Sequence, residues 1–198
     1  MTTAVTAGTK TYTSEEYLAL EIASETRSEF RNGEIVAMTG GTPAHNEIAG
    51  SFFFLLKSAL RRQPYSIFMT DQRLWIPGAN LHTYPDVMLM PRPPILKPGR
   101  KDTVMDAVLI AEVLSDSTEA YDRNKKFEHY RTMETLQEYV LIDQYRSHVE
   151  RYEKQSENQW IFTEYSGLDT SFALSSAPVE IEMSDLYEAV EFEPSAEN

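Results

Sequence analysis

A nearly unbroken apolar run at residues 107–114 constrains the fold of this chain more than any other feature. It reads Ala-Val-Leu-Ile-Ala-Glu-Val-Leu, and a run of this kind forms a strand that is buried on both faces. The segments 86–90 and 138–143 have the same character. Because helical patterns at 44–62 and 117–133 alternate with these strands, the sequence predicts an α/β domain with a mixed central sheet flanked by helices.

Turn and capping signals place the remaining elements. The pair Asn32-Gly33 is the strongest short signal for a two-residue hairpin turn, which here joins 27–31 to 34–38. Upstream, Ser14 is the expected N-cap of a helix with two acids in its first turn. Residues 67–76 are predicted to form one strand. Toward the C-terminus we expect a second hairpin and a short capped helix, at 148–154, 160–165 and 184–190.

The domain organisation is expected to be simple. The chain has 198 residues, with no internal repeat and no linker, which predicts a single domain over residues 12–190. Residues 1–11 are expected to form a flexible tail and residues 191–198 an acidic tail. Because the start does not resemble a signal peptide and no apolar stretch is long enough to span a bilayer, we expect a cytoplasmic protein with no membrane partner.

The composition excludes several chemistries. The chain has no cysteine, which rules out disulfides, thiolate zinc sites and a cysteine nucleophile. Its 18 Lys and Arg residues against 31 Asp and Glu residues give a net charge of −13. Because neutralising phosphates supplies most non-specific affinity for nucleic acid, this charge argues against a strong general DNA binder, although a local basic groove is compatible with it.

Two acids occupy strand positions where a charge is costly. Glu112 interrupts the long apolar run, and Asp86 opens another apolar strand. A carboxylate buried on a strand is expensive unless it is paired or binds a metal. Side chains alternate along a strand, so Ile110, Glu112 and Leu114 should share one face. Two such acids at the ends of neighbouring strands suit Mg²⁺, although Asp86 could simply cap its strand and Glu112 could be structural.

The helix predicted at 117–133 supplies a cation. At about 100° per residue, Lys126 falls on the inward side, near Tyr130, whereas Lys125 points toward solvent. Asp122, an accessory candidate one turn earlier, could hold Lys126 through an i,i+4 ion pair. An ammonium near a metal-bound phosphate would stabilise developing negative charge or orient the attacking water. The alternative for Lys126 is a surface lysine whose stem covers apolar side chains.

Five segments follow one another in a characteristic order. They are Glu29-Phe-Arg-Asn-Gly33, Thr42-Pro-Ala-His45, Ala111-Glu-Val-Leu-Ser115, Asp122-Arg-Asn-Lys-Lys-Phe-Glu-His-Tyr130 and Glu138-Tyr-Val-Leu-Ile-Asp143. Over residues 12–190 this pattern resembles the Uma2 family, also called DUF820, a group of restriction-endonuclease-like proteins abundant in cyanobacteria. The resemblance implies the restriction-endonuclease-like fold of the PD-(D/E)xK nuclease superfamily, with Pro85-Asp86 as the PD pair.

The resemblance also implies a set of site residues. Asp86 and Glu112 would bind Mg²⁺ or Mn²⁺, with the main-chain carbonyl of Val113 as a further ligand. The superfamily pattern places its catalytic lysine two residues after the glutamate, where this chain has Leu114. As in Uma2 proteins, the lysine is expected on the following helix instead, as Lys126, from which it could reach the same phosphate.

Other polar residues are accessory candidates. Glu29 could be an additional ligand, or it could form a cross-strand ion pair with Arg27 or Arg31. His45 could act as a general base, or it could cap its helix at the edge of the core. Gln72, together with the neighbouring Arg73, could contact substrate from the strand predicted at 67–76.

Three functional hypotheses follow. The first is a Mg²⁺-dependent endonuclease that hydrolyses DNA phosphodiester bonds with metal-activated water. The second is a non-catalytic regulatory or interaction module that keeps the nuclease fold, which the acidic charge favours. The third is a metal hydrolase of a smaller phosphorylated substrate. A homodimer is compatible with the first hypothesis, because nuclease folds of this type often pair to reach both strands.

Overall fold

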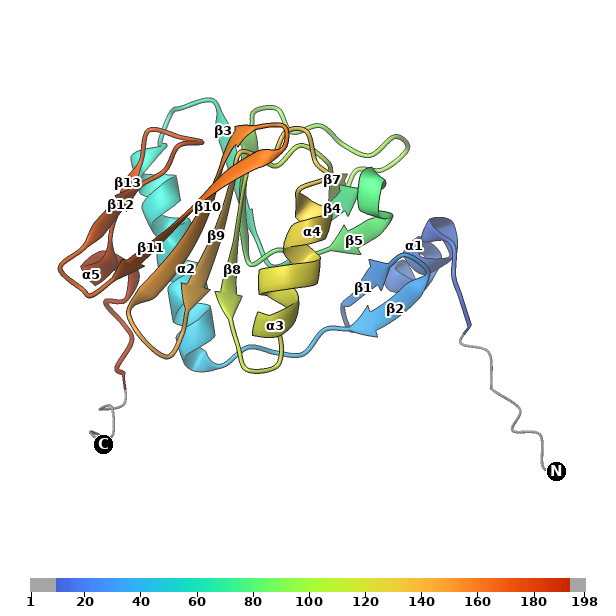
Figure 1. The fold of residues 1–198 in the computed structure, drawn as a ribbon. Coiled ribbons are helices and arrows are strands. Elements are labelled where there is room, and N and C mark those ends of the chain that lie inside the picture. The colour runs from blue at the N-terminus through green and yellow to red at the C-terminus, as the bar shows by residue number, and fades with distance from the viewer. Residues whose placement is uncertain (1–9, 193–198) are drawn as a thin grey trace.

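The structure, a computed structural model, describes residues 10–192, so most of the two predicted tails lies outside the described residues. Its centre is a six-stranded sheet in the order β11-β10-β9-β8-β6-β3 (Figure 1). Strands β8 and β9 are parallel, and all other neighbours are antiparallel. The predicted mixed central sheet is therefore confirmed. Its strands are β3 (Tyr65–Met69), β6 (Val87–Pro91), β8 (Leu109–Leu114), β9 (Glu138–Asp143), β10 (His148–Ser156) and β11 (Gln159–Ser166).

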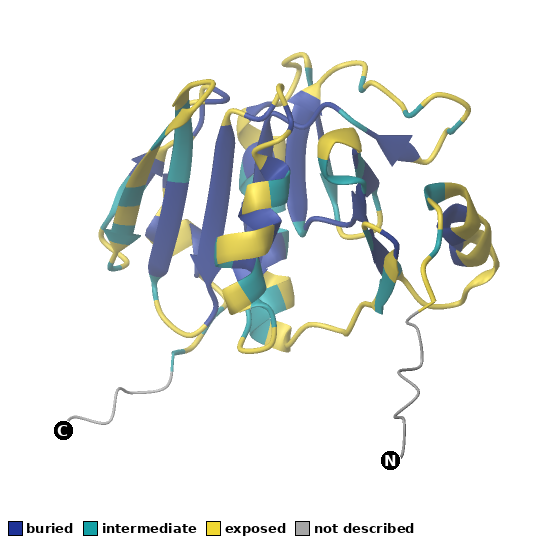
Figure 2. Cartoon of the chain, turned by 45° about the vertical axis from the view of Figure 1, so that its right-hand side comes forward, coloured by how far each residue is buried: buried dark blue, intermediate teal, exposed yellow. Residues whose placement is uncertain are grey.

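Strand β8 separates two hydrophobic cores. Leu109, Ala111 and Val113 face the core that includes helix α2, whereas Ile110 and Leu114 face the core beneath the helical segment that follows β8. All six residues of β8 are buried, as the dark central strands in Figure 2 show. The alternation predicted along this strand is confirmed, and it directs the side chain between Ile110 and Leu114 toward the second core.

Helix α2 (Pro43–Ala59) covers one face of the central sheet (Figure 1). Thr42 begins it as the N-cap, since its hydroxyl accepts a hydrogen bond from the His45 amide at 3.1 Å, and Pro43 occupies the first turn. The buried side chains of α2 recur at helical spacing and form one stripe against the strands. They are Ile48, Ala49, Phe52 and Leu56.

The opposite face of the sheet is covered by a helical segment with an unusual middle. A single helix was expected over 117–133, but the structure has α3 (Glu119–Tyr121), a π-helical turn η2 (Asp122–Lys126) and α4 (Phe127–Tyr130) in succession. Turns of this type are uncommon and occur often at functional sites. Here the π turn begins at Asp122 and ends at Lys126, so it carries both candidate residues of this segment.

A second sheet lies beside the first and was not anticipated as a unit. Its order is β2-β1-β5-β4-β7, and its pairs are antiparallel except for the parallel pair β4–β7. Its strands are β1 (Ser28–Arg31), β2 (Glu34–Ala37), β4 (Arg73–Ile76), β5 (Leu81–Thr83) and β7 (Thr103–Val104), with the short helix η1 (Pro77–Ala79) before β5. The predicted hairpin is confirmed, and Asn32 and Gly33 both have positive φ at its turn.

The single strand predicted over 67–76 is wrong. The chain turns at residues 70–72, so that β3 ends in the central sheet and β4 begins in the second sheet. Thr70 adopts a positive φ of 35°, and the Asp71 amide bonds back to the Met69 carbonyl. Thr70 carries no glycine-like signal, so the break is imposed by tertiary contacts such as the bond from its amide to the Asp86 carbonyl at 3.2 Å.

The N-terminal helix α1 (Ser14–Ala23) begins one residue earlier than predicted. Thr13, and not Ser14, is the N-cap, and Thr13 and Glu16 form a reciprocal capping box. Ser14 instead bonds through its hydroxyl to His82 Nε2 at 2.8 Å.

The C-terminal part contributes a small hairpin, β12 (Ser171–Ala173) and β13 (Glu180–Glu182), and α5 (Met183–Leu186), which is shorter than the predicted 184–190 helix. These elements pack their apolar side chains into the same core as α2. Across residues 10–192, no helix combines the length and the apolar character that a membrane span requires.

Candidate metal-dependent active site

A cavity of about 530 Å³ lies at the N-terminal end of α2, beside the C-terminal end of β8 and the π turn. The β1–β2 hairpin and the loop 38–42 form one wall, and the loop 115–118 with Tyr121 and Tyr145 forms another. Most of the residues singled out in the sequence line this cavity. They are Glu29, His45, Asp86, Glu112, Val113, Asp122 and Lys126.

Asp86 stands immediately before β6 and is fixed through one of its oxygens. Its Oδ2 accepts a hydrogen bond from the Val113 amide at 2.8 Å, and His45 Nε2 lies 3.2 Å from the same oxygen. The side chain is 17% exposed, so it is partly shielded but open to the cavity. Because both contacts use Oδ2, the Oδ1 atom is available to a further ligand.

Glu112 projects from β8 on the face shared with Ile110 and Leu114, as the sequence predicted. Its Oε1 accepts hydrogen bonds from the Tyr130 hydroxyl at 2.6 Å and from Lys126 Nζ at 2.9 Å. Oε2 has only a long contact of 3.4 Å with the Asp86 amide. Burial raises the pKa of Glu112 and the nearby Asp86 carboxylate adds to the rise, whereas the ammonium of Lys126 lowers it.

Lys126 reaches the same place from the π turn. Its Nζ lies 2.9 Å from Glu112 Oε1 and 3.1 Å from Asp122 Oδ1, so the proposed i,i+4 contact with Asp122 is present. Burial on its own lowers the pKa of Lys126, but the carboxylates of Glu112, Asp122 and Glu29 raise it well above the usual value. The side chain therefore stays an ammonium although it is buried. Tyr139 secures the turn by donating from its hydroxyl to the Asp122 carbonyl at 3.1 Å.

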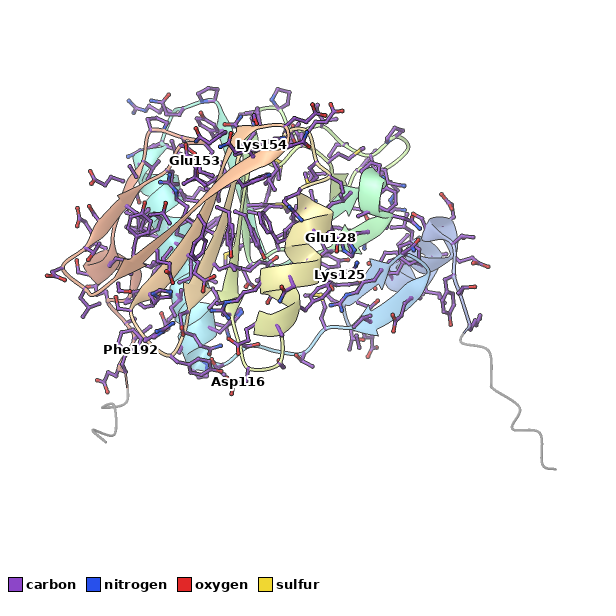
Figure 3. The ribbon with its side chains drawn as sticks, viewed as in Figure 1. Asp116, Lys125, Glu128, Glu153, Lys154 and Phe192 are labelled. Atoms are coloured by element: carbon purple, nitrogen blue, oxygen red, sulfur yellow. The ribbon has the colours of Figure 1, made fainter. Side chains whose placement is uncertain are left out.

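The neighbouring Lys125 has the opposite environment. Its side chain is 60% exposed and pairs with Glu128 at 2.9 Å on the outer side of the helical segment (Figure 3). The predicted difference between the two adjacent lysines is therefore confirmed. One lysine lies in the cavity wall, and the other lies in solvent.

Glu29 forms an ion pair with Arg31, one of the arginines of its hairpin, and its side chain faces the cavity. It lines the cavity, and its Oε2 accepts hydrogen bonds from Arg31 Nε and Nη2 at 2.8 and 2.6 Å. The pairing lies within β1 rather than across the hairpin. Although burial raises the pKa of Glu29, Lys126, Arg31 and a hydrogen bond from Thr83 together lower it below the usual value. Glu29 is therefore ionised near neutral pH.

His45 sits in the first turn of α2, beside Asp86. Burial lowers its pKa, but the hydrogen bond and the charge of Asp86 reverse this, so that the pKa lies above its ordinary value. Within residues 10–192, its Nδ1 is buried and has no hydrogen-bond partner. The loop before α2 comes close to this ring, because a Cβ on Gly41 would lie only 2.8 Å from Nδ1. His45 thus contacts Asp86 at the oxygen that also accepts the Val113 amide.

Gln72 and Arg73 do not line the cavity. Gln72 lies in the turn that separates β3 from β4, where its side-chain amide donates to the Asp102 carbonyl at 2.9 Å. Arg73 is buried, and its Nε donates to the Tyr84 hydroxyl at 2.8 Å. The break in the predicted strand directs both side chains toward the segment around Asp102 and away from Asp86.

Sequence reasoning missed three groups that organise the site. Tyr130, four residues after Lys126, holds Glu112, and its spacing could have signalled this contact. Gln144 has no such signal. Its side chain joins the Thr42 hydroxyl at 2.5 Å to the Leu114 carbonyl at 2.6 Å and so ties the start of α2 to the end of β8. Arg31 was considered only as a partner of Glu29, but it also lines the cavity.

The donor set can accommodate a hard divalent cation. In each of the two carboxylates, one oxygen has few protein contacts: Oδ1 in Asp86 and Oε2 in Glu112. Val113, whose carbonyl is the further candidate ligand, also lines the cavity. Among residues 10–192, no three His, Asp or Glu side chains are grouped to hold a metal ion on their own. Mg²⁺ does not require such a group, because it is commonly bound by one or two carboxylates together with waters and substrate phosphate.

Comparison with known proteins identifies the family of this chain. Residues 14–185 match the model of the Uma2 family, which is described as "Putative restriction endonuclease". The chain belongs to the Uma2 family. Within this family, a protein of Synechocystis sp., "Uncharacterized protein sll1609", is 40% identical over 171 residues that cover 86% of this chain and 97% of the relative. A second Synechocystis protein, slr1290, is 32% identical and covers 78% of this chain and 80% of the relative.

A solved structure of another protein has the same fold as this Uma2 chain. The crystal structure of a protein from Anabaena variabilis, described as a "putative nuclease belonging to DUF820", superimposes with a TM-score of 0.72. The match covers 89% of this chain and 98% of that one, at 19% sequence identity. The restriction-endonuclease-like fold is thereby confirmed, and family and fold together support a nuclease.

Proposed function

We propose that this Uma2 protein is an endonuclease that hydrolyses DNA phosphodiester bonds and depends on Mg²⁺ or Mn²⁺. One observation carries the proposal. Asp86 before β6, Glu112 on β8 and Lys126 on the π turn come from three separate elements and meet at one cavity. A buried cluster of carboxylates and an ammonium costs stability, and such clusters are concentrated at sites that use their charge.

In this proposal Asp86, Glu112 and the Val113 carbonyl would hold the cation. A divalent cation there would offset the charge of a phosphate and lower the pKa of a coordinated water. The protein prepares both carboxylates for this task. Val113 N–H and His45 fix Oδ2 of Asp86, and Tyr130 and Lys126 fix Oε1 of Glu112, so that the remaining oxygens are held in place before substrate arrives.

Lys126 would supply positive charge to the phosphate. Its ammonium is held by Glu112 and Asp122 at hydrogen-bond distance, so its position requires no rearrangement when substrate binds. A preorganised donor in a site shielded from water stabilises negative charge that develops on phosphate oxygens. The lysine on the helix can therefore take the role that a lysine at position 114 would have on the strand.

The proposal is tested by incubating the purified protein with supercoiled plasmid. We expect nicked and linear products in Mg²⁺ or Mn²⁺ and none in EDTA, because the carboxylates alone supply no electrophile for the phosphate. Gel electrophoresis over time measures the rate. Identical traces with the metal ions and with EDTA, at protein concentrations in excess of plasmid, would contradict the proposal.

A second candidate is hydrolysis of a smaller phosphorylated molecule. The cavity volume of about 530 Å³ falls in the range of small-ligand sites, roughly 300–1,000 Å³, and the net charge of −13 favours a substrate with few phosphates. A panel of oligonucleotides and mononucleotides, assayed by chromatography in Mn²⁺, separates the two candidates. Turnover confined to mononucleotides would replace the nuclease proposal with this one.

A further inference from the structure

The cavity contains a second cation that the proposed metal site does not use. Lys126 is enclosed by acids and is 8% exposed, whereas the side chain of Arg31 is 29% exposed on the cavity wall. Among residues 10–192, Arg31 and Lys126 are the Arg and Lys side chains that line the cavity. The same lining carries five carboxylates, namely those of Glu29, Asp86, Glu112, Asp116 and Asp122. Of the two cationic side chains, Arg31 is therefore the more accessible to an entering phosphate.

Arg31 is held in a fixed orientation. Its Nε and Nη2 donate to Glu29 Oε2, and its guanidinium carbon lies 3.8 Å from the centre of the Tyr121 ring. Thr83 in turn donates to Glu29 Oε1. Within residues 10–192, Nη1 of Arg31 makes no hydrogen bond, so it can donate to an incoming oxygen. A guanidinium that is already stacked and anchored loses little further freedom when it binds a phosphate.

The position of the catalytic candidates restricts the form of the substrate. Glu112 is 3% exposed, so the scissile phosphate has to enter the cavity to approach it. A duplex carries its phosphates on a broad, rigid surface, whereas a cavity of about 530 Å³ is the size of a small-ligand site. A single strand is narrower and more flexible than a duplex, so it can place one phosphate inside such a cavity.

The cavity wall also offers surfaces for an unpaired base. Tyr145 lines it and is 53% exposed, whereas Arg31 covers one face of the Tyr121 ring. Stacking of bases on aromatic rings is a sequence-tolerant contact that single-strand binders combine with positive charge. The acidic net charge of −13 disfavours a duplex, which presents a higher density of phosphates than a single strand.

We propose that the site selects single-stranded nucleic acid, with one unpaired nucleotide in the cavity and its phosphate held by Arg31. This inference rests on the proposed function, because it assumes that the cavity is the nuclease site. Arg31 is a substrate-binding residue in this account, and Glu29 and Tyr121 position it.

The test measures binding by fluorescence anisotropy, with Ca²⁺ in place of Mg²⁺ so that binding is read without relying on cleavage. The probes are a labelled single-stranded oligonucleotide, the same sequence in a duplex, and a labelled mononucleotide. We expect the single strand to bind at least about tenfold more tightly than either other probe. Arg31→Met should weaken its binding about ten- to hundredfold, the usual effect of a lost charge-assisted hydrogen bond.

Two further variants keep the test decisive. Arg31→Lys keeps the charge next to the buried Glu29 but loses the planar, stacked donor, so it should fold and should weaken single-strand binding by about tenfold. Arg61→Met removes an exposed arginine just after α2, outside the cavity, and should bind like the wild type. Thermal unfolding verifies that each variant is folded.

The outcomes separate this inference from the nuclease proposal. Equal affinity for single strand and duplex, equal affinity for the mononucleotide, or unchanged binding in folded Arg31→Lys would overturn the inference. If Arg31→Met cleaves plasmid at the wild-type rate, the inference fails and the nuclease proposal stands. If single strands bind in an Arg31-dependent manner but Mg²⁺ and Mn²⁺ produce no cleavage of the single-stranded oligonucleotide or of plasmid, the nuclease proposal fails and the binding inference stands.

Discussion

Asp86→Asn is expected to abolish metal-dependent cleavage while leaving the protein folded. The amide keeps the shape of the side chain, and its oxygen can still accept the hydrogen bond from the Val113 amide. It loses the negative charge with which Asp86 would bind the cation, and electrostatic groups of this kind contribute at least about a hundred- to thousandfold to rate. Plasmid cleavage in Mg²⁺ and Mn²⁺ measures the loss.

The stability of the same variant provides an independent check. Asp86 and Glu112 repel each other, since the Asp86 charge helps to raise the pKa of Glu112. Removing that charge should leave the unfolding temperature unchanged or raise it, as is common when a functional cluster is neutralised. Asp71→Asn is the matched control, because its carboxylate is 84% exposed, and it should cleave like the wild type. Cleavage by Asp86→Asn within about threefold of the wild type would contradict the assigned role.

Lys126→Met is expected to be the most destabilising single change in the site. The methionine fills a similar space, but it leaves the carboxylates of Glu112 and Asp122 buried without their cation. Removing one partner of a buried ion pair costs about 3–5 kcal/mol, because the remaining charge is neither solvated nor paired. Chemical denaturation gives this value directly. Lys125→Met, which changes a 60% exposed lysine, should stay within about 0.5 kcal/mol of the wild type.

A double variant tests the physical reason for that cost. Glu112→Gln removes the charge that Lys126 neutralises and keeps an acceptor for the Tyr130 hydroxyl. Lys126→Met combined with Glu112→Gln should therefore be more stable than the sum of the two single changes predicts, by about 1–3 kcal/mol. Strict additivity would show that the two charges do not interact in the folded protein, contrary to the 2.9 Å contact.

The proximity of these groups could be predicted from the sequence for identifiable reasons. Strand alternation is strict, so an acid between Ile110 and Leu114 must lie on their face. On the following helical segment, Lys126 was placed inward although the segment contains a π turn, because its four-residue spacing to Asp122 and Tyr130 brings all three to one side. Both inferences depend on local periodicity, which a short stretch of sequence defines well.

Features that depend on distant contacts could not be predicted in this way. The strands of the second sheet are two to four residues long, and the pairs β1–β5 and β4–β7 join distant segments, so local patterns predict the β1–β2 hairpin but not the sheet that contains it. Gln72 was misplaced because Thr70 turns the chain without a glycine. Likewise, Gln144 links Thr42 to Leu114, and the hydrogen bond between Thr42 and Gln144 joins residues that are 102 positions apart in the sequence. Such contacts are specified by the assembled fold rather than by any segment of it.

The central claim is that Asp86 and Glu112 hold a divalent cation beside Lys126, and crystals soaked in Mn²⁺ test it most directly. Anomalous scattering locates the ion independently of any assay. The account predicts one strong peak bounded by the Asp86 and Glu112 carboxylates in the wild type and no peak there in Asp86→Asn. A wild-type map without a peak at these carboxylates, with Lys126 still bound to Glu112, would contradict it.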